Sequence, residues 1–428
     1  MQNALNAEDF GFSSEKCADE NSAALNKACE NGGEIRIMKK GTYEISDAVI
    51  LKSNTTLIFG EEVYIKRTDS KNGISYVFIN EGAYSHTYNE NIKIIGLKLI
   101  TGGIDDGKYS VNKDEFINGL RGHVSLFYVK NAVIDGFEVY DLPPSYFALH
   151  ICTFSDLTIE NCKIEGMKDG VHLGRGENFV IRNCEFKTFD DPIALNAHDY
   201  AISNPQLGWI ENGRIENCTD MAAEHTTGYF CRMLGGAWVD WHENMVIRNS
   251  DTVVSDGKLY RAFLKPDGKE YISKTAPSFS ETEKILDEIR WVKVQDEAIY
   301  SCGCRNIEFD NIYLKKKREC AFSLHFDDDN WSHSYYKGAK APVMENITFK
   351  RIHVENKIPI LISSTAPIEN IGIESSDFKK SIIVLDKIKS ANPEYPIANI
   401  SFKSVMFESF ISDIIKCKNL RKVHFTIN

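Results

Sequence analysis

The sequence predicts an all-β protein whose short strands coil into a parallel β-helix. One observation is a recurring phrase, in which Asn precedes alternating apolar residues and then Asn-Cys or its equivalent: DLTIENCKI from Asp156, NFVIRNCEF from Asn178, NGRIENCTD from Asn212 and NMVIRNSDT from Asn244. The shortest steps between copies are 22 to 25 residues, and helical periodicity is almost absent after residue 30. Repeats this short cannot bury their own apolar face, so they stack into a solenoid with a continuous core.

The expected elements follow in order along residues 1–428, which we treat as one β-helix domain. Residues 20–33, ENSAALNKACENGG, have the pattern of a short helix that caps the first coil, with glycines after its end. The runs GEIRIMKKGTYEI and LKSNTTLIFGEEVYI begin the coils. The interval from Asn244 to Asn306 is 62 residues long. Residues 251–295 are therefore expected to form an inserted β-rich subdomain or one wall of a cleft.

Two columns of side chains are expected along the coils. Asparagine tolerates the left-handed backbone of a tight turn, and stacked amides can hydrogen-bond along the axis. The expected column consists of Asn161, Asn183, Asn217 and Asn249. Just inside it, Cys162, Cys184 and Cys218 should form a ladder of buried, reduced thiols. The 11 cysteines lack the spacing of a zinc site, so we expect no metal at the cysteines and no cofactor, while a calcium site at Asp327 and Asp329 stays open.

Charge and hydropathy exclude several classes of partner. The net charge is −11, and lysines and arginines are scattered among the acids, which argues against nucleic acid and against anionic membranes. No run of 18 apolar residues is present, so we expect no insertion into a membrane. The opening MQNALNAEDFG lacks a basic region followed by an apolar run, so no signal peptide is expected in this chain.

The repeat also predicts a column of acids. Counting 12 or 13 residues on from Asp156, Asn178 and Asn212 leads to Asp169, to Asp190 with Asp191, and to Glu224 with His225. Adjacent coils lie about 4.8 Å apart, so Asp169 and Asp191 should face one another at about that distance. Pro192 favours a bend in the chain, which would let the side chains of both Asp190 and Asp191 face the same site.

Carboxyl groups this close repel one another, so at least one of them should titrate abnormally. Diagonal pairs across neighbouring coils would fall near the separation of about 6.5–9.5 Å that inverting glycosidases use. In those enzymes one carboxylic acid protonates the leaving oxygen, and the other carboxylate activates a water. The spacing of the acids therefore favours hydrolysis of a glycoside.

The acid motifs and the opening EDFGF, followed by NSAALNKACENGGEIRIMKKGTYEI, resemble the polygalacturonase family of glycoside hydrolases, family 28, among the pectin-lyase-like β-helices. The resemblance implies a single-stranded, right-handed parallel β-helix. In that family an Asn-Thr-Asp motif precedes an Asp-Asp motif by one coil; Met167-Lys168-Asp169 and Asp190-Asp191 match it in acids and spacing. It implies that Asp190 is the general acid and that Asp169 and Asp191 hold the attacking water.

Two other motifs of the family are missing. The Gly-His-Gly motif has its nearest counterpart in His225, and the Arg-Ile-Lys motif, which grips a substrate carboxylate in the family, has its nearest counterpart in Lys293. Galacturonate as the sugar is therefore not favoured. Aromatic faces bind sugar rings, and charged groups bind hydroxyls or anionic groups. On these grounds the expected substrate-binding residues are His225, Glu224, Arg232, His198, Trp238, Trp331 and Lys293.

The sequence as a whole predicts an inverting glycoside hydrolase that cleaves a plant or microbial polysaccharide or oligosaccharide of pectin or galactoside type. Long insertions after Asp199, Ser250 and Asp327 favour a walled pocket and attack on chain ends. Two alternatives stay open: a polysaccharide lyase with Lys168 or Arg175 as base, and a glycan-binding solenoid without catalysis. A carbohydrate is the expected partner of a monomer that is extracellular or periplasmic, with the cytoplasm as the alternative.

Overall fold

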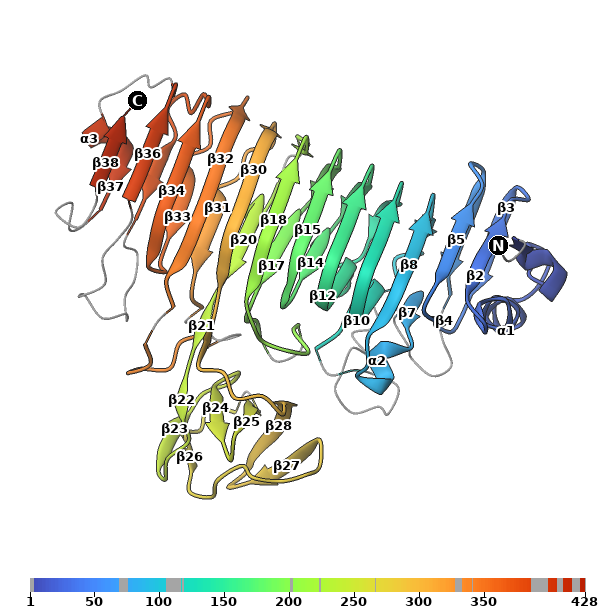
Figure 1. Ribbon diagram of the computed structural model, residues 1–428, viewed down its shortest axis with the longest axis horizontal. Helices are drawn as coiled ribbons and strands as arrows, with labels where there is room; N and C mark the ends of the chain where they lie inside the picture. The colour runs from blue at the N-terminus through green and yellow to red at the C-terminus, as the bar shows by residue number, and fades with distance from the viewer. Residues whose placement is uncertain are drawn as a thin grey trace.

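The computed structural model describes residues 4–68, 76–104, 117, 119–200, 203–222, 225–265, 267–327, 333–340, 342–385, 399–405, 411–417 and 424–427. These residues form a parallel β-helix in which 29 strands join into one sheet that winds around a shared core. Figure 1 shows the coils stacked along the long axis of the molecule. The expected fold class is confirmed. None of the helices in the described ranges has the length and apolarity to cross a bilayer.

Strands at the same position on successive coils pair in parallel and form three columns. The first column carries the candidate site and contains β4 (Val49–Leu51), β7 (Phe78–Asn80), the first halves of β10 (Gly122–Asp135) and β12 (Phe147–Glu160), β14 (Val171–Leu173), β17 (Ile193–Asn196), β20 (Cys231–Leu234), β31 (Cys320–His325), β33 (Ile360–Ser364), β35 (Ile382–Val384) and β37 (Ile415–Lys416), which follows the short helix α3 (Ile411–Ile414).

The second column contains β1 (Leu5–Asn6), β2 (Gly33–Ile37), β5 (Thr55–Phe59), β8 (Asn89–Ile95), the second halves of β10 and β12, β15 (Gly176–Arg182), β18 (Ile210–Glu216), β30 (Cys304–Leu314), β32 (Met344–Val354), β34 (Ile368–Glu374), β36 (Asn399–Lys403) and β38 (His424–Ile427). The third contains β3 (Gly41–Ile45), β6 (Val63–Arg67), β9 (Lys98–Ile100), β11 (Glu138–Leu142), β13 (Lys163–Gly166), β16 (Glu185–Thr188) and β19 (Thr219–Asp220).

Stacked asparagines hold the turns between columns in register. The Asn183 amide donates to Asn161 Oδ1 and the Asn217 amide donates to Asn183 Oδ1, both at 3.3 Å, and all three residues have φ between +53° and +57°. Beside them, the thiols Cys162, Cys184 and Cys218 are buried in the core. The predicted asparagine column continues from Asn217 to Asn311, at 2.8 Å, and not to Asn249.

The ends of the solenoid differ in how they are closed. At the N-terminus, the 3-10 helix η1 (Ala7–Phe10) precedes α1 (Ala18–Cys29), which buries Leu25 and Cys29 against the first coils. A second short helix, α2 (Gly82–Ser85), lies between β7 and β8. At the C-terminus, β38 pairs with β36 and ends the stack. The N-terminal helix expected within residues 20–33 is present, displaced slightly toward the N-terminus.

An insertion interrupts the coils between β20 and β30 and hangs below them in Figure 1. Its stalk is the antiparallel pair β21 (Gly236–Ala237) and β29 (Ser301–Cys302). Its sheets contain β22 (Val239–Asp240), β23 (Met245–Ile247), β24 (Thr252–Ser255), β25 (Lys258–Phe263), β26 (Tyr271–Ser273), β27 (Glu283–Leu286) and β28 (Ile289–Gln295), around a core of their own that includes Tyr260 and Trp291. The repeat copy from Asn244 belongs to this insertion, because β23 pairs antiparallel with β26; its expected place in the solenoid is wrong.

Candidate functional site

Two of the predicted acids meet because β14 and β17 pair in register. Val171 pairs with Ile193, so the positions just before the two strands are also equivalent on the two coils. Asp169 stands two residues before Val171, and Asp191 stands two residues before Ile193. The 22-residue spacing between the two acids is thus one full coil, and it places both carboxyl groups at the same level of the solenoid.

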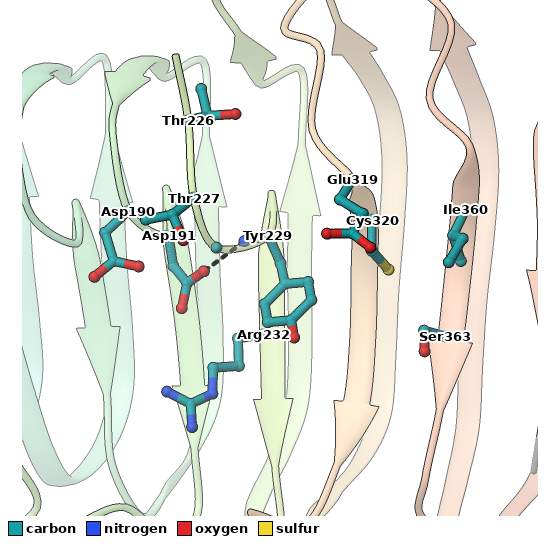
Figure 2. Close-up of a pocket in the computed structure, with 11 residues that line it drawn as sticks. Asp190, Asp191, Thr226, Thr227, Tyr229, Arg232, Glu319, Cys320, Ile360 and Ser363 are labelled. Carbon is teal, nitrogen blue, oxygen red and sulfur yellow. Dashed lines mark hydrogen bonds between the residues drawn. The ribbon is translucent and has the colours of Figure 1, made fainter. Parts of the chain in front are cut away.

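Asp190 joins these acids where the chain turns after β16. The Thr188 hydroxyl donates to the Asp190 carbonyl oxygen at 2.8 Å, and Pro192 follows the pair. One carboxyl oxygen from each of Asp169, Asp190 and Asp191 lies within 4.8 Å of the other two. The Asp190 side chain is 23% exposed, whereas the other two are buried. Figure 2 shows Asp190 and Asp191 side by side. We call these three residues the acid cluster.

Lys168 is the cation of the acid cluster. Its ammonium forms an ion pair with Asp190 and lies 3.6 Å from Asp169 Oδ1. Burial by itself lowers the pKa of Lys168, but the charges of Asp169, Tyr200 and Asp190 outweigh it and raise that pKa. Each acid of the cluster could offer one oxygen to a metal ion. The ammonium of Lys168 supplies positive charge at the same place, and the expectation of a site without a metal stays a prediction.

The acid cluster also retains a proton to higher pH than isolated carboxyl groups do. Burial and the neighbouring charge of Asp169 raise the pKa of Asp190. Burial, with Asp190 and Asp169 as further causes, raises the pKa of Asp191 well above its ordinary value. Two carboxyl groups that interact this strongly titrate as a pair. The pair therefore combines a proton donor with a carboxylate, which is the combination that general acid–base chemistry requires.

His172 links the acid cluster to a fourth carboxyl group. Its Nδ1 lies 2.9 Å from Asp169 Oδ2, and its Nε2 lies 3.4 Å from Asp199 Oδ2. Burial lowers the pKa of His172 well below its ordinary value, so the ring is neutral and carries one N–H. Burial raises the pKa of Asp199 to about 6. With its N–H on Nδ1, the ring donates to Asp169 Oδ2 and fixes the orientation of that carboxylate.

A cavity of about 380 Å³ opens beside the acid cluster, and its volume is within the range of ligand pockets. Asp190 and Asp191 lie at one end. Its other lining residues include Thr226, Tyr229, Arg232, Glu319, Ile360 and Ser363, which come from the next three coils (Figure 2). The Tyr229 amide donates to Asp191 Oδ1 at 2.6 Å. The segment before β20 therefore both lines the cavity and holds the buried acid in place.

Arg232 lies on β20 and is itself held by acids. Its Nη2 lies 2.5 Å from Asp327 Oδ2, and its Nε lies 3.3 Å from His325 Nε2. His325 Nε2 in turn lies 3.0 Å from Asp327 Oδ1. Burial by itself would raise the pKa of Asp327, but the Arg232 charge outweighs it and lowers that pKa below the ordinary range. The guanidinium is thus in a partly buried ion pair at the edge of the cavity.

The other predicted substrate-binding residues are dispersed. His225 is exposed next to the cavity residue Thr226. Lys293 lies on β28 of the insertion, where its Nζ is 3.0 Å from Asp296 Oδ1. Glu224 and Trp331 lie outside the described residues. Of the predicted substrate-binding residues that the structure describes, Arg232 is the one that lines the cavity.

Two of the predicted substrate-binding residues are buried and do not line the cavity. Trp238 is 2% exposed, and its indole N–H donates to the Ile299 carbonyl at 2.5 Å. His198 is fully buried 6.0 Å from the Trp238 ring, and burial lowers its pKa to about 3. Both side chains pack where the insertion joins the solenoid, so neither presents a face to a sugar. Their place as substrate-binding residues is corrected accordingly.

Comparison with known proteins agrees with the fold. Residues 147–261 match the family model described as right handed beta helix region. The chain is similar to a polygalacturonase of Gossypium hirsutum, with 24% identity over 267 residues that cover 53% of this chain and 62% of that protein. It is also similar to exopolygalacturonase rpg13 of Rhizopus delemar, with 23% identity over 185 residues that cover 42% of this chain and 44% of that protein.

Among solved structures, ORF18 of Geobacillus virus E2 has a TM-score of 0.53 and 10% identity, and the match covers 95% of this chain and 62% of that one. At this identity the likeness concerns the fold alone. The aligned segments span 38%, 44% and 62% of three curated polygalacturonases. The chain is therefore a right-handed parallel β-helix protein that is similar to polygalacturonases, and its own activity has to be argued from its site.

Gly228 offers a test of how tightly the acid cluster is packed. Its φ is +67°, and a Cβ there would overlap Asp191 Oδ1 and lie 2.8 Å from Asp190 Oδ1. Gly228→Ala should therefore displace the acids and lower any turnover by about two orders of magnitude, since small displacements of catalytic groups cost that much. Gly257→Ala is the matched control, because Gly257 has φ +70° with no atom near its would-be Cβ. Equal activity of the two variants would contradict this packing.

Asp199 gives a pH-dependent prediction for stability. Its pKa of about 6 exceeds that of an unfolded aspartate, so its contribution to stability is present at low pH and lost as pH rises through about 6. Asp199→Asn mimics the protonated acid. As the pH rises from about 4 to about 7, the free energy of unfolding of Asp199→Asn should increase relative to that of the wild type by about 1–3 kcal/mol. Urea unfolding measures this difference, and the exposed Asp9→Asn is the control. A difference that does not change with pH would refute the raised pKa.

Proposed function

We propose that the protein is a glycoside hydrolase whose chemistry is carried out by Asp169, Asp190 and Asp191. The observation that supports this most directly is the convergence of these acids, within 4.8 Å of one another, at the end of a cavity large enough for sugar residues. Glycoside hydrolysis needs a proton donor and a carboxylate on one scissile bond. The similarity to polygalacturonases supports the same reaction class.

In this proposal Asp190 is the general acid. It is the partly exposed member of the pair, so its carboxyl group can reach a leaving oxygen in the cavity. After it gives up its proton, the ammonium of Lys168 stabilises the carboxylate that remains, because the ammonium lies in direct contact with that carboxyl group. Lys168 therefore favours the transition state, in which negative charge develops on Asp190, over the protonated ground state.

Asp169 and Asp191 hold the attacking water. Both are buried and fixed by neighbours, Asp169 by the His172 ring and Asp191 by the Tyr229 amide. The oxygens of the cluster lie closer together than the expected range of about 6.5–9.5 Å for inverting enzymes. One water that makes two hydrogen bonds of about 2.8 Å can span the separation of up to 4.8 Å between these carboxyl oxygens. We therefore propose inversion by a water bridging two carboxylates, in place of the diagonal pair expected from the sequence.

The lyase alternative loses its proposed base. A base must be deprotonated at working pH, and the pKa of Lys168 is raised by the acids around it, after allowance for burial. Arg175 lies 3.2 Å from Glu297 in an ion pair, and arginine does not lose its proton in proteins. Hydrolysis at chain ends remains the proposed mode, as the name of the Rhizopus relative also describes, but the described lining of the cavity contains no residue of the insertion.

Asp190→Asn should fold normally and lose at least about three orders of magnitude of turnover, because it cannot donate the proton to the leaving group. The assay is release of reducing ends from a panel of plant and microbial polysaccharides. With an active substrate, proton NMR of the first-formed sugar should show the inverted anomer. Substantial activity of Asp190→Asn would remove the assigned acid, and a retained anomer would replace the water mechanism by a covalent one.

A further inference from the structure

The charges around the cavity indicate which kind of sugar it takes. Of the described residues that line it, three carry carboxyl groups (Asp190, Asp191 and Glu319), and Arg232 is the single cation. Glu319, an exposed residue, precedes β31 two coils beyond Asp191, and Ile360 and Ser363 lie on the coil beyond it, so the two groups of acids stand on either side of one coil (Figure 2). A ligand between them faces carboxyl groups from two sides.

The single lining cation is already neutralised. Arg232 is paired with Asp327 at 2.5 Å and has His325 at 3.3 Å, and its side chain is 16% exposed. Burial by itself would lower its pKa, but Asp327, Asp199 and Asp191 together raise it. A carboxylate from a ligand would have to compete with these groups for one guanidinium.

The neighbouring cations are also committed elsewhere. Lys168 pairs with two acids of the cluster. Arg318 is fully buried on Asp220 at 2.6 Å and donates to the Thr227 carbonyl, so it supports the cavity wall from behind. Lys317 and Lys357, which precede the strands that line the cavity, are exposed and do not line it.

The remaining lining suits a ligand without charge. Tyr229 and Ile360 offer apolar surface to the C–H face of a sugar ring, and Thr226, Thr227 and Ser363 offer hydroxyl groups. Carboxylates accept hydrogen bonds from sugar hydroxyls without any net charge on the sugar. A uronate in the same place would bring a further negative charge to a partly buried acidic cavity, where like charges repel more strongly than in water.

We propose that the sugar bound between Asp191 and Glu319 is uncharged, so that the substrate is a neutral glycan and not a polyuronide. This inference rests on the proposed function, of which it specifies the substrate class. It separates this chain from the curated relatives, whose names describe polygalacturonases.

Matched pairs of methyl glycosides test the inference by binding alone. The pairs are galactose with galacturonate, glucose with glucuronate and mannose with mannuronate, titrated into the full chain and followed by saturation-transfer NMR. In each pair that binds, the neutral sugar should bind at least about tenfold more tightly than its uronate. Salt at about 0.5 M should reduce this ratio of affinities, because it screens the repulsion between charges. Tighter binding of a uronate, or no binding by any member, overturns the proposal.

Charge reversal at Glu319 tests the cause. Glu319→Lys should shift the ratio of uronate to neutral-sugar affinity by about tenfold toward the uronate. Glu270→Lys, at an exposed position of the insertion, is the matched control and should leave the ratio unchanged. If Glu319→Lys does not fold, Glu319→Gln should still shift the ratio in the same direction by about threefold. No shift with a folded variant contradicts the electrostatic origin of the selectivity.

Hydrolysis assays keep the two proposals apart. Polygalacturonan and its carboxyl-reduced form share one linkage and differ in charge. Cleavage of neutral glycans, with the carboxyl-reduced form preferred over its parent, supports both proposals. Preferred cleavage of the polyuronide leaves the hydrolase function standing and refutes the neutral substrate. Selective binding of neutral sugars without any hydrolysis refutes the hydrolase and retains the charge selectivity.

Discussion

The register between adjacent coils is the constraint on which the candidate site depends. A parallel ladder repeats each strand position one coil later, so the pairing of Val171 with Ile193 fixes where Asp169 and Asp191 stand. The asparagine stack at the turns, with Asn183 bonded to the coils on both sides, reinforces that register. Slippage by one residue would turn one acid into the core. Sequence spacing is therefore converted directly into carboxyl separation.

Bringing three acids together is unfavourable, and the surrounding residues offset the cost in three ways. Lys168 supplies a positive charge, Arg232 contributes a more distant one, and the Asp190–Asp191 pair retains a proton. Removing one member of a buried ion pair destabilises the protein by more than the formation of the pair stabilises it, because the other charge is left buried without a partner. The arrangement resembles a preorganised active site, in which the groups that stabilise developing charge are fixed before the substrate binds.

The fold and the acid cluster could be predicted from the sequence because both depend on a recurring phrase whose copies at Asp156 and Asn178 are one 22-residue coil apart. The period fails at the insertion, so the copy from Asn244 was assigned to the solenoid although it forms β23. Glu319 could not be placed in the cavity for the same reason. Trp238 shows a different limit, since residue type does not distinguish a buried indole from one that binds sugar.

The central claim is that coil register adds Asp169 to the adjacent pair Asp190 and Asp191, so that this pair retains a proton to higher pH than isolated carboxyl groups do. Carbon-13 NMR titration of aspartate carboxyl groups measures this directly, with assignments from Asp190→Asn and Asp191→Asn. We predict that both resonances shift together and that their apparent pKa values lie above the ordinary aspartate range. Each substitution should lower the pKa of the remaining acid, because the repulsion from its neighbour is gone. Independent titration of the two groups at ordinary values would contradict the account.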